Sequence, residues 1–412
     1  MDGMNFSFSK IWFVAACVAG FWAGTLSAAD DVSIAQGEVT RANAGFDPLA
    51  DIGELPKETA APDSASASVQ PASVQPASVA PAAEAEKPVP AKPETHRAFL
   101  FDYELSGFSQ RDYAAAVADL FSAYEKNTGR KLVPAEKKKV ALKIYTASGK
   151  GLSTPVALTR AVRDELIRRG FARENILLVD LSEKALRRAG YLPPFRRGEN
   201  DWEGSPVVAL DTGDFYNAKW FIENPLPSRE SYSMTTSTKW DEPQNDRKSF
   251  LPIPLLFDVD FWINLPVATD SPALGVSGAL ANATLWGVSN QRRFLDNPAN
   301  AAALAVGVAT IPEFKAKFEL TLLSLEKFQF IGAPKFYAEY TASEKRLWLS
   351  ANPVILDYLL WLRMNACRSR RGFEPILPEP PVFAMASRGS VSLGSCVSSE
   401  ITLVELPAKD EK

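Results

Sequence analysis

The stretch that most constrains the fold spans residues 257–287, with the sequence FDVDFWINLPVATDSPALGVSGALANATLWG. Residues 257–267 form an apolar run rich in β-branched and aromatic side chains, which is typical of a strand buried on both faces of a sheet. A polar turn follows at residues 268–272, and small residues then recur at helical spacing. Small side chains let a backbone approach another element or a ligand closely. The stretch therefore predicts a strand, a loop and a tightly packed helix at the centre of one α/β domain.

Strand-like and helix-like segments alternate through the rest of residues 98–407. The expected strands are residues 98–103, 140–146, 175–180, 207–210, 318–330 (one long strand or a pair of strands), 346–350, 391–393 and 400–406. The expected helices are residues 109–129, 154–170, 182–189, 300–310 and 353–366. The alternation predicts a single α/β domain with a largely parallel sheet, helices on both faces and right-handed crossovers. Residues 211–247 are polar and contain three prolines, which is typical of a functional or mobile loop.

The N-terminus has the layout of a secretory signal peptide over residues 1–29. Lys10 precedes an apolar run that is shorter than the roughly 20 residues of a spanning helix, and small residues end the segment near Ala29. Two alternatives stay open, an uncleaved membrane anchor and a lipoprotein in which Cys17 carries the lipid. We expect cleavage near Ala29, no stable membrane span afterwards, and a location in the bacterial periplasm or outside the cell.

Residues 30–97 are dominated by Ala, Pro, Ser, Val, Gln and Glu, and the sequence Ala-Ser-Val-Gln-Pro recurs within them. Such a segment cannot bury enough apolar surface to offset its ordering entropy. We expect a disordered linker that acts as an extended spacer between the bacterial envelope and the folded domain. Residues 408–412 are expected to be a disordered tail.

Composition excludes several classes of function. The net charge of −4 offers no basic surface for a nucleic acid. After the predicted signal peptide only Cys367, Cys396 and His96 remain as cysteine or histidine ligands, so neither a zinc site of these residues nor an iron–sulfur cluster is expected. No cofactor is expected, although a cation site made only of carboxylates stays open. The two thiols could pair in an oxidising compartment, which the sequence does not decide.

The loop GKGLSTP at residues 149–155 follows a predicted strand and precedes a predicted helix. Its glycines, Lys150, Ser153, Thr154 and the helix N-terminal amides could bind an anionic small molecule. The order of residues does not match a Walker phosphate loop. The alternative, which the capping chemistry favours, is an ordinary turn in which Thr154 caps the helix and Pro155 occupies its first turn.

Two charged residues interrupt apolar segments. Lys143 lies in the strand VALKIYT and is expected either at the sheet edge or facing a cleft, where burial would lower its pKa and suit it to act as a base or electrostatic clamp. Asp357 lies in the apolar helix VILDYLLWLRM and needs a partner. That partner is expected to be Arg363 or another cation, or else Asp357 lies in a cleft with a perturbed pKa.

Further polar side chains lie near the presumed strand ends. Asp270 and Ser271 are in the turn after the strand expected at residues 257–267. Asn282 is in the segment of small residues that follows, and Asn352 precedes the helix expected at residues 353–366. Each is a candidate ligand-binding residue, because ligands of open α/β sheets bind beyond the carboxyl ends of the strands.

The order of these segments resembles the domain-of-unknown-function family 362. The resemblance rests on VALKIYT, STPVALTRAVRDELIRRGFARENILLVD, DVDFWINLPVATDSPALGVSGALANATLWGV, RLWLSANPVILDYLLWLRM and VSLGSCVSSEITLVEL. Lys143, Asn282 and Asp357 match the pattern of the family. The usual lysine and histidine of its loop, the lysine of its Lys-Asn pair and its frequent ferredoxin-like cysteine cluster are missing here. The resemblance implies an α/β fold over about residues 98–406 and no established reaction.

Two functions are compatible with these observations. The first is an exported, divergent domain that binds a ligand or a protein partner of the envelope through a degenerate site. The second is a periplasmic enzyme acting on an anionic small molecule, in which Lys143 orients the anion, Asn282 donates a hydrogen bond and Asp357 is the acid or base. The second requires these three side chains to converge. A purely structural role in the envelope is a third alternative.

Overall fold

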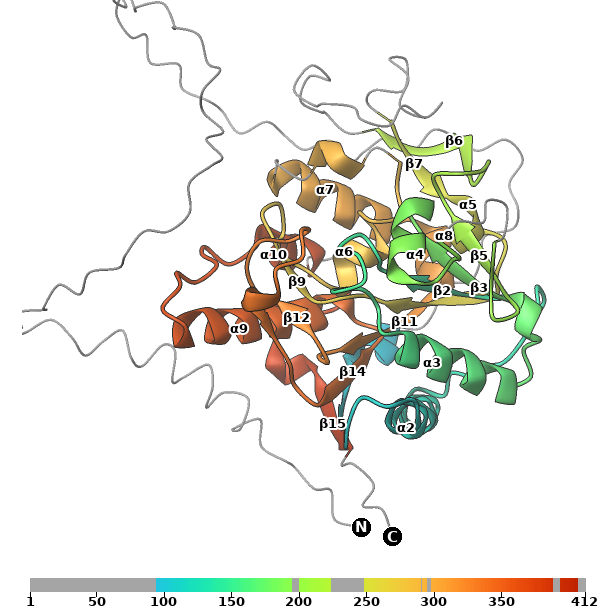
Figure 1. Cartoon of the computed structure of the whole chain (residues 1–412), viewed down its shortest axis with the longest axis horizontal. Helices are drawn as coiled ribbons and strands as arrows, with labels where there is room; N and C mark the ends of the chain where they lie inside the picture. Colours follow the sequence, from blue (N-terminus) through green and yellow to red (C-terminus); the bar gives the residue numbers. More distant parts are fainter. Residues whose placement is uncertain are drawn as a thin grey trace, which may run out of the picture. The chain divides into compact units, whose positions relative to one another are not determined.

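The computed structural model describes residues 94–194, 200–223, 248–289, 291–294, 298–387 and 393–406 (Figure 1). All of them lie in one compact unit, Ala77–Lys412. The predicted signal peptide, the tail and nearly all of the predicted linker lie outside the described residues. The end of the predicted linker differs from expectation, because the 3-10 helix η1 covers Glu94–Ala98 and His96 is buried.

A nine-stranded sheet forms the centre of the described part, in the order β15-β1-β14-β11-β8-β2-β3-β5-β4. In chain order its strands are β1 (Phe99–Glu104), β2 (Val140–Ile144), β3 (Ile176–Asp180), β4 (Asp201–Trp202), β5 (Ser205–Ala209), β8 (Phe261–Leu265), β11 (Phe318–Ser324), β14 (Arg346–Ser350) and β15 (Thr402–Leu406). Strands β2 and β8 lie in its interior and are fully buried, as their apolar runs predict.

The sheet is mixed, so the prediction of a largely parallel sheet is wrong. Strand β14 runs antiparallel to both β1 and β11, and β4 runs antiparallel to β5. Residues 325–345, which join β11 to β14, contain only short strands and a 3-10 turn, and such a connection returns the chain antiparallel without a crossover helix. An apolar run is equally typical of a buried strand in either direction, so the sequence pattern did not distinguish them.

Helices cover both faces of the sheet (Figure 1). Helices α2 (Gln110–Thr128), α3 (Val156–Arg168) and α4 (Glu183–Ala189) share a hydrophobic core with one face. Helices α6 (Ala279–Ala283), α8 (Pro312–Lys317) and α9 (Pro353–Arg370) contact the other face, over β2, β8, β11 and β14. The α/β class and the two helical layers are therefore confirmed.

Smaller elements surround this frame. Strands β9 (Thr269–Ser271), β10 (Gly275–Ser277), β12 (Phe328–Gln329) and β13 (Thr341–Ala342) form a second sheet, and β6 (Tyr216–Glu223) pairs with β7 (Lys248–Pro252). The remaining helices are α5 (Ile253–Leu256), α7 (Pro298–Ala309), α10 (Pro381–Ala386), η2 (Arg173–Asn175), η6 (Gln291–Phe294), η7 (Ala338–Tyr340) and η9 (Ser398–Glu400). Strand β6 occupies part of the predicted loop at 211–247, of which residues 224–247 lie outside the described residues. None of the helices in these ranges is long and apolar enough to cross a membrane.

The stretch at residues 257–287 folds as a strand followed by a short helix, as predicted. The segment that joins them differs from the prediction. Strand β9 occupies the expected loop, and β10, which pairs with it, covers Gly275–Ser277, where the helix was expected to begin. The expected helix is therefore wrong over these residues, and α6 is only five residues long. The predicted close packing is confirmed, because a Cβ at Gly278 would collide with the carboxylate of Asp357 in α9. Glycine is therefore needed where α6 begins.

Helix α2 shows how local sequence sets an element's ends. Ser109 is its N-cap and forms a capping box with Asp112, and Gly129 ends the helix at a φ of +70°. The capping box pairs amides at the N-terminus of the helix, and the amide of Gly129 donates to the Glu125 carbonyl in its last turn.

We predict that Ser109→Ala lowers the free energy of unfolding by about 1 kcal/mol, because the amide of Asp112 loses its acceptor. Denaturant unfolding measures the change. Ser122→Ala is the matched control, since the exposed Ser122 of α2 bonds the carbonyl of Ala118 within its own helix. Equal effects of the two substitutions would contradict the capping role.

Candidate functional site

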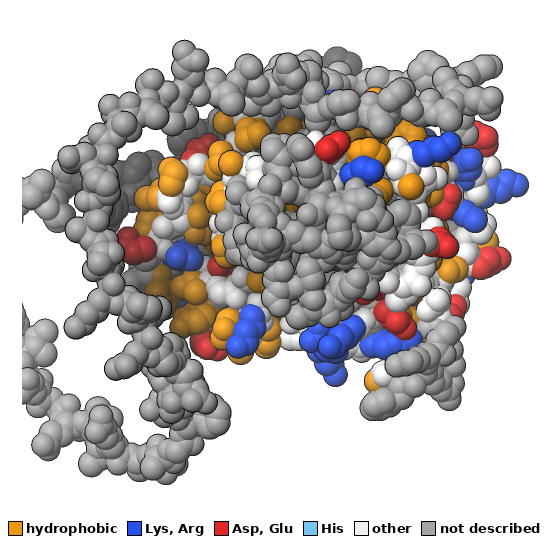
Figure 2. Space-filling model, turned by 90° about the horizontal axis from the view of Figure 1, so that it is seen from above, with side chains coloured by type: hydrophobic (Ala, Val, Ile, Leu, Met, Phe, Trp, Pro, Cys, Tyr) orange, Lys and Arg blue, Asp and Glu red, His pale blue; other side chains and the backbone are white. Residues whose placement is uncertain are grey.

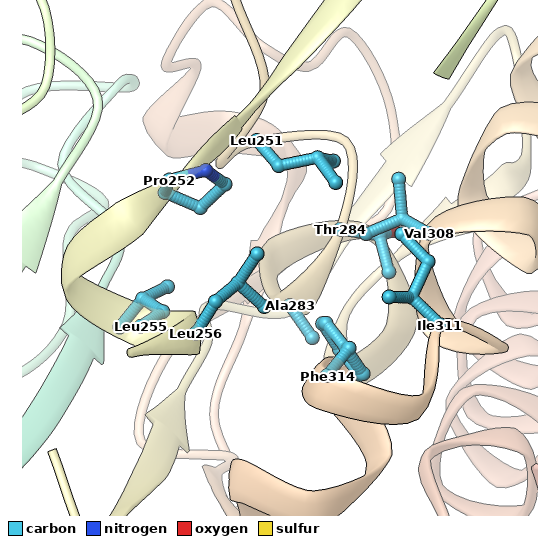
Figure 3. Close-up of a pocket in the computed structure, with 9 residues that line it drawn as sticks. All are labelled: Leu251, Pro252, Leu255, Leu256, Ala283, Thr284, Val308, Ile311 and Phe314. Carbon is cyan, nitrogen blue, oxygen red and sulfur yellow. The ribbon is translucent and has the colours of Figure 1, made fainter. Parts of the chain in front are cut away.

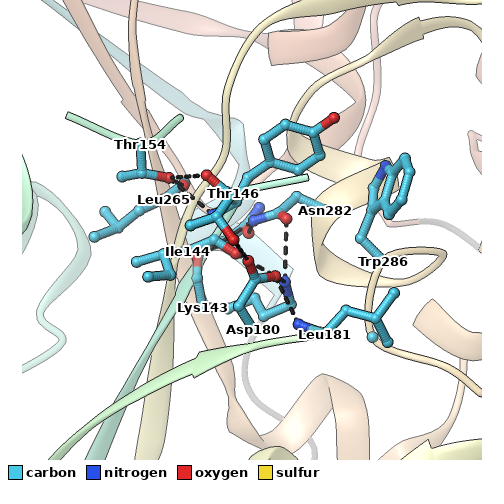
Figure 4. Close-up of polar contacts among 12 residues, drawn as sticks. Lys143, Ile144, Thr146, Thr154, Asp180, Leu181, Leu265, Asn282 and Trp286 are labelled. Atoms are coloured by element: carbon cyan, nitrogen blue, oxygen red, sulfur yellow. Dashed lines mark hydrogen bonds and ion pairs between the residues drawn. The ribbon is translucent and has the colours of Figure 1, made fainter. Parts of the chain in front are cut away.

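Lys143 lies in the middle of the sheet. Strand β2 is flanked by β8 and β3, so an edge position for Lys143 is wrong. Its side chain is 0% exposed, and its Nζ donates to the Ile144 carbonyl at 2.8 Å, to Asp180 Oδ1 at 3.0 Å and to Asn282 Oδ1 at 3.2 Å (Figure 4). These three bonds use all the donors of an ammonium group.

The carboxylate of Asp180 is equally well satisfied. Besides Nζ of Lys143, it accepts the hydroxyl of Thr146 at 2.5 Å and the amide of Leu181 at 2.7 Å. Burial lowers the pKa of Lys143, and the charge and hydrogen bond of Asp180 oppose that shift. A buried ion pair is tolerated only when its remaining polar atoms are bonded, which is the case here.

Two asparagine amides complete the network. Asn264 in β8 donates from Nδ2 to the Ala279 carbonyl at 2.8 Å and to Thr321 Oγ1 at 3.1 Å. Its Oδ1 is therefore the acceptor for Asn282 Nδ2, at 2.8 Å. This arrangement turns the carbonyl oxygen of Asn282 toward Lys143.

Asp357 binds the backbone at the start of α6. Its two oxygens accept the amides of Ala279 at 2.6 Å and Leu280 at 2.9 Å. The expected cationic partner is wrong, because Arg363 pairs with Glu344 instead. Burial raises the pKa of Asp357 to about 7, and the two amide hydrogen bonds only partly offset this rise.

Lys143, Asn282 and Asp357 therefore meet around α6. This helix carries Asn282, and its first amides donate to Asp357 of α9. Each is nearly or fully buried, and each polar group contacts protein. None of the three lines either of the cavities described below. Their roles in binding or in acid–base catalysis stay predictions.

The other candidate residues near strand ends also hold the backbone. Asp270 accepts the amides of Gly332 and Ala333, each at 2.9 Å, and burial raises its pKa. Ser271 accepts an amide of its own turn. Asn352 caps α9 by accepting two amides of its first turn. The structure gives each of these side chains an anchoring contact.

A cavity of about 210 Å³ lies beyond the carboxyl ends of β2, β8 and β11. The loop after β2 contributes residues 150–156, and the loop after β8 contributes 266–267. Ser324 at the end of β11, and Glu326 and Lys327 in the loop after it, complete this part of the lining. The predicted ligand-binding residues Lys150, Ser153 and Thr154 are all among them. The cavity brings together parts of three loops that are distant in sequence.

The position of this cavity follows from the chain's topology. After β2 the chain continues through α3 to β3 on one side, whereas after β8 it continues to β11 on the other side. The two connections also pack on opposite faces of the sheet. Neighbouring strands whose connections diverge in this way leave a crevice at their carboxyl ends, where ligands of open α/β sheets bind.

The lining of the cavity suits a small anion. Lys150 is exposed, and no residue in the described ranges accepts a hydrogen bond from it. Lys327 donates to the carbonyl of Gly151 at 3.0 Å, which joins the loops after β2 and β11. Ser153 offers a hydroxyl, and the first turn of α3 offers amides without helical partners. Glu326 adds one negative charge to this lining.

Thr154 has a different role from the one expected. The N-cap of α3 is Pro155, with no side-chain cap. The Thr154 hydroxyl instead donates to the Leu265 carbonyl at 2.6 Å and accepts the Tyr145 amide at 2.9 Å. It therefore ties the end of β2 to the end of β8, directly beside the cavity.

Glu326 and Lys327 are cavity residues that the sequence analysis missed. Their signal was a pair of opposite charges directly after the apolar run that became β11. Without the order of the strands, nothing related this pair to the loop at residues 149–155.

A second cavity is apolar and very small. It has about 10 Å³ and is lined by side chains such as Leu251, Leu255, Val308 and Phe314 (Figure 3). That volume holds about one water molecule, and the lining offers few polar partners. We assign it no ligand.

Among the described residues, charged side chains and thiols do not form a metal centre. On the face drawn in Figure 2, basic and acidic side chains are interspersed. Within the described ranges, no group of three metal-ligating side chains lies close enough together to hold a metal ion. Cys367 and Cys396 are free thiols, and burial raises the pKa of Cys396.

Comparisons with known proteins do not identify the chain. No protein-family model and no curated protein matches it. It is similar to the crystal structure of a protein from Thermotoga maritima, with 10% sequence identity and a TM-score of 0.33. The match covers 66% of this chain and 60% of that protein's length. The resemblance to domain-of-unknown-function family 362 stays a prediction.

We predict that Asp357 makes the stability of the protein depend on pH. The folded state keeps its proton up to a pKa of about 7, whereas the unfolded state releases it near 3.8. The stabilisation from this group is therefore complete below pH 4 and is lost as the pH rises to about 7. Since one pKa unit corresponds to about 1.4 kcal/mol, the loss is about 4 kcal/mol at most.

Urea unfolding at several pH values, of the wild type and of Asp357→Asn, measures this contribution. The variant has no proton to lose, so the stability of the wild type should fall relative to it between pH 4 and pH 7. Parallel curves would contradict the assignment.

Proposed function

We propose that this chain is an exported domain that binds a small anionic ligand in the cavity beyond β2, β8 and β11. The observation that supports it is the position of this cavity at a point where the connections of neighbouring strands diverge, together with its lysines. A volume of about 210 Å³ is below the roughly 300 Å³ at which typical ligand pockets begin, so the ligand is a small one.

In this proposal Lys150 is the main contact to the anion. It is exposed at the cavity, whereas Lys327 already donates to Gly151. The hydroxyl of Ser153 and the amides of the first turn of α3 add uncharged donors. Loss of a charge-assisted hydrogen bond of about 1.5–3 kcal/mol weakens binding about tenfold or more.

We predict that Lys150→Ala raises the dissociation constant for a bound anion about tenfold. Calorimetric titration with inorganic phosphate and with succinate, at low and high salt, measures binding to the wild type and the variant. Lys137→Ala is the control, since Lys137 is an exposed lysine before β2, at the opposite end of the strand. If neither anion binds the wild type, or if both variants bind alike, the proposal is wrong.

The enzymatic alternative has less support. It requires Lys143 and Asp357 to reach a substrate, whereas both are buried and bonded to protein. A general acid or base must come within hydrogen-bonding distance of the reacting group. Binding is therefore the proposal that the cavity favours.

The export of the chain rests on residues 1–29, which lie outside the described residues. We predict that protein recovered from the envelope fraction begins near residue 30, which its denatured mass reports. A mass increased by lipid, and restored to that of the unmodified chain in Cys17→Ser, would instead identify a lipoprotein. A full-length mass would contradict cleavage.

A further inference from the structure

A primary amine and a carboxamide lie in contact inside the sheet, next to a carboxylate. Nζ of Lys143 is 3.2 Å from Oδ1 of Asn282 and 3.0 Å from Oδ1 of Asp180. The three residues are 0%, 1% and 3% exposed, respectively. We propose that Lys143 and Asn282 form an intramolecular amide bond, with Asp180 as the catalytic acid–base residue. This proposal does not depend on the anion cavity.

The reaction needs no partner outside the chain. Asp180 takes one proton from the ammonium of Lys143, and the neutral Nζ attacks Cγ of Asn282. In the tetrahedral intermediate a second Nζ proton passes to Nδ2, the Cγ–Nδ2 bond breaks, and ammonia leaves. The ammonia carries away the proton held by Asp180. The products are a secondary amide and one ammonium ion, and the carboxylate of Asp180 is regenerated.

The surroundings favour this step in three ways. Burial lowers the pKa of Lys143, which favours the nucleophilic amine. Asn264 orients the amide so that its carbonyl faces Nζ. The two reacting groups are held on β2 and α6. Folding has therefore already removed the translational and rotational entropy that two separate molecules would lose on reacting.

The bond would join β2 covalently to α6, two elements that are far apart in sequence. Lys143 and Asn282 are 139 residues apart, and Asn282 lies on the short helix whose first amides bind Asp357. A covalent closure of this length restricts the unfolded chain, as a disulfide does. An exported domain whose two described thiols are free would gain a link that reducing agents do not break.

The wild-type protein tests the proposal directly. Its denatured mass should be lower by one ammonia than the mass calculated from its observed N-terminus to its C-terminus, and a digest should contain a peptide pair joined through Lys143 and Asn282. Fragmentation of that pair must locate the bond. A digest with both residues in separate, unmodified peptides would overturn the proposal. A cyclic imide at Asn282 also releases ammonia, but it leaves Lys143 free and would count against the bond.

Variants test the role of Asp180. Asp180→Asn should reduce the linked fraction at least tenfold in freshly purified protein. Glu319→Gln is the matched control, because Glu319 is a buried carboxylate that bonds Tyr124 and Arg130 on the α2 side of the sheet. The control should remain fully linked. Full linkage in Asp180→Asn would overturn the role of Asp180. If this variant does not fold, the wild-type digest still decides whether the bond exists.

Discussion

The burial of the Lys143 amine as the chain folds is the constraint on which the centre of this fold depends. An ammonium group in the interior is tolerated only if every donor is bonded and a counter-charge lies nearby. Asp180 supplies the charge, and Asn282 and the Ile144 carbonyl supply the other acceptors. These partners come from β2, β3 and α6, so satisfying one side chain fixes how the helix sits against two neighbouring strands.

Three polar side chains elsewhere in the domain bind the backbone. Asp357 holds the first amides of α6, Asp270 holds the turn at Gly332, and Asn352 caps α9. Irregular connections beyond the strands leave amides without partners, and a buried amide without a partner is costly. A carboxylate or amide in an apolar segment therefore indicates an anchor as readily as a ligand site. The cavity is different, because its exposed Lys150 has no such contact within the described ranges.

Much of the fold could be predicted, because apolar periodicity and end signals are local. The expected strand at residues 346–350 coincides with β14, and Ser109 and Gly129 mark the ends of α2 as expected. Strand direction was not predicted, since β14 has the same apolar pattern as its neighbours. Of the site, the loop at Lys150 was identified, whereas Lys327 was not, because their proximity depends on the order of β2, β8 and β11.

The sequence by itself determined the alternation of strands and helices, the close approach at Gly278 and the residues that are chemically unusual. These follow from side-chain size, spacing and polarity along the chain. Only the tertiary structure decided which unusual residues meet. It placed Lys143 against Asp180 and Asn282, gave Asp357 backbone amides instead of a cation, and left Lys150 exposed at a crevice. The physical reason is that hydrogen-bond partners from different strands are set by sheet order and register, which residues far apart in the sequence jointly determine.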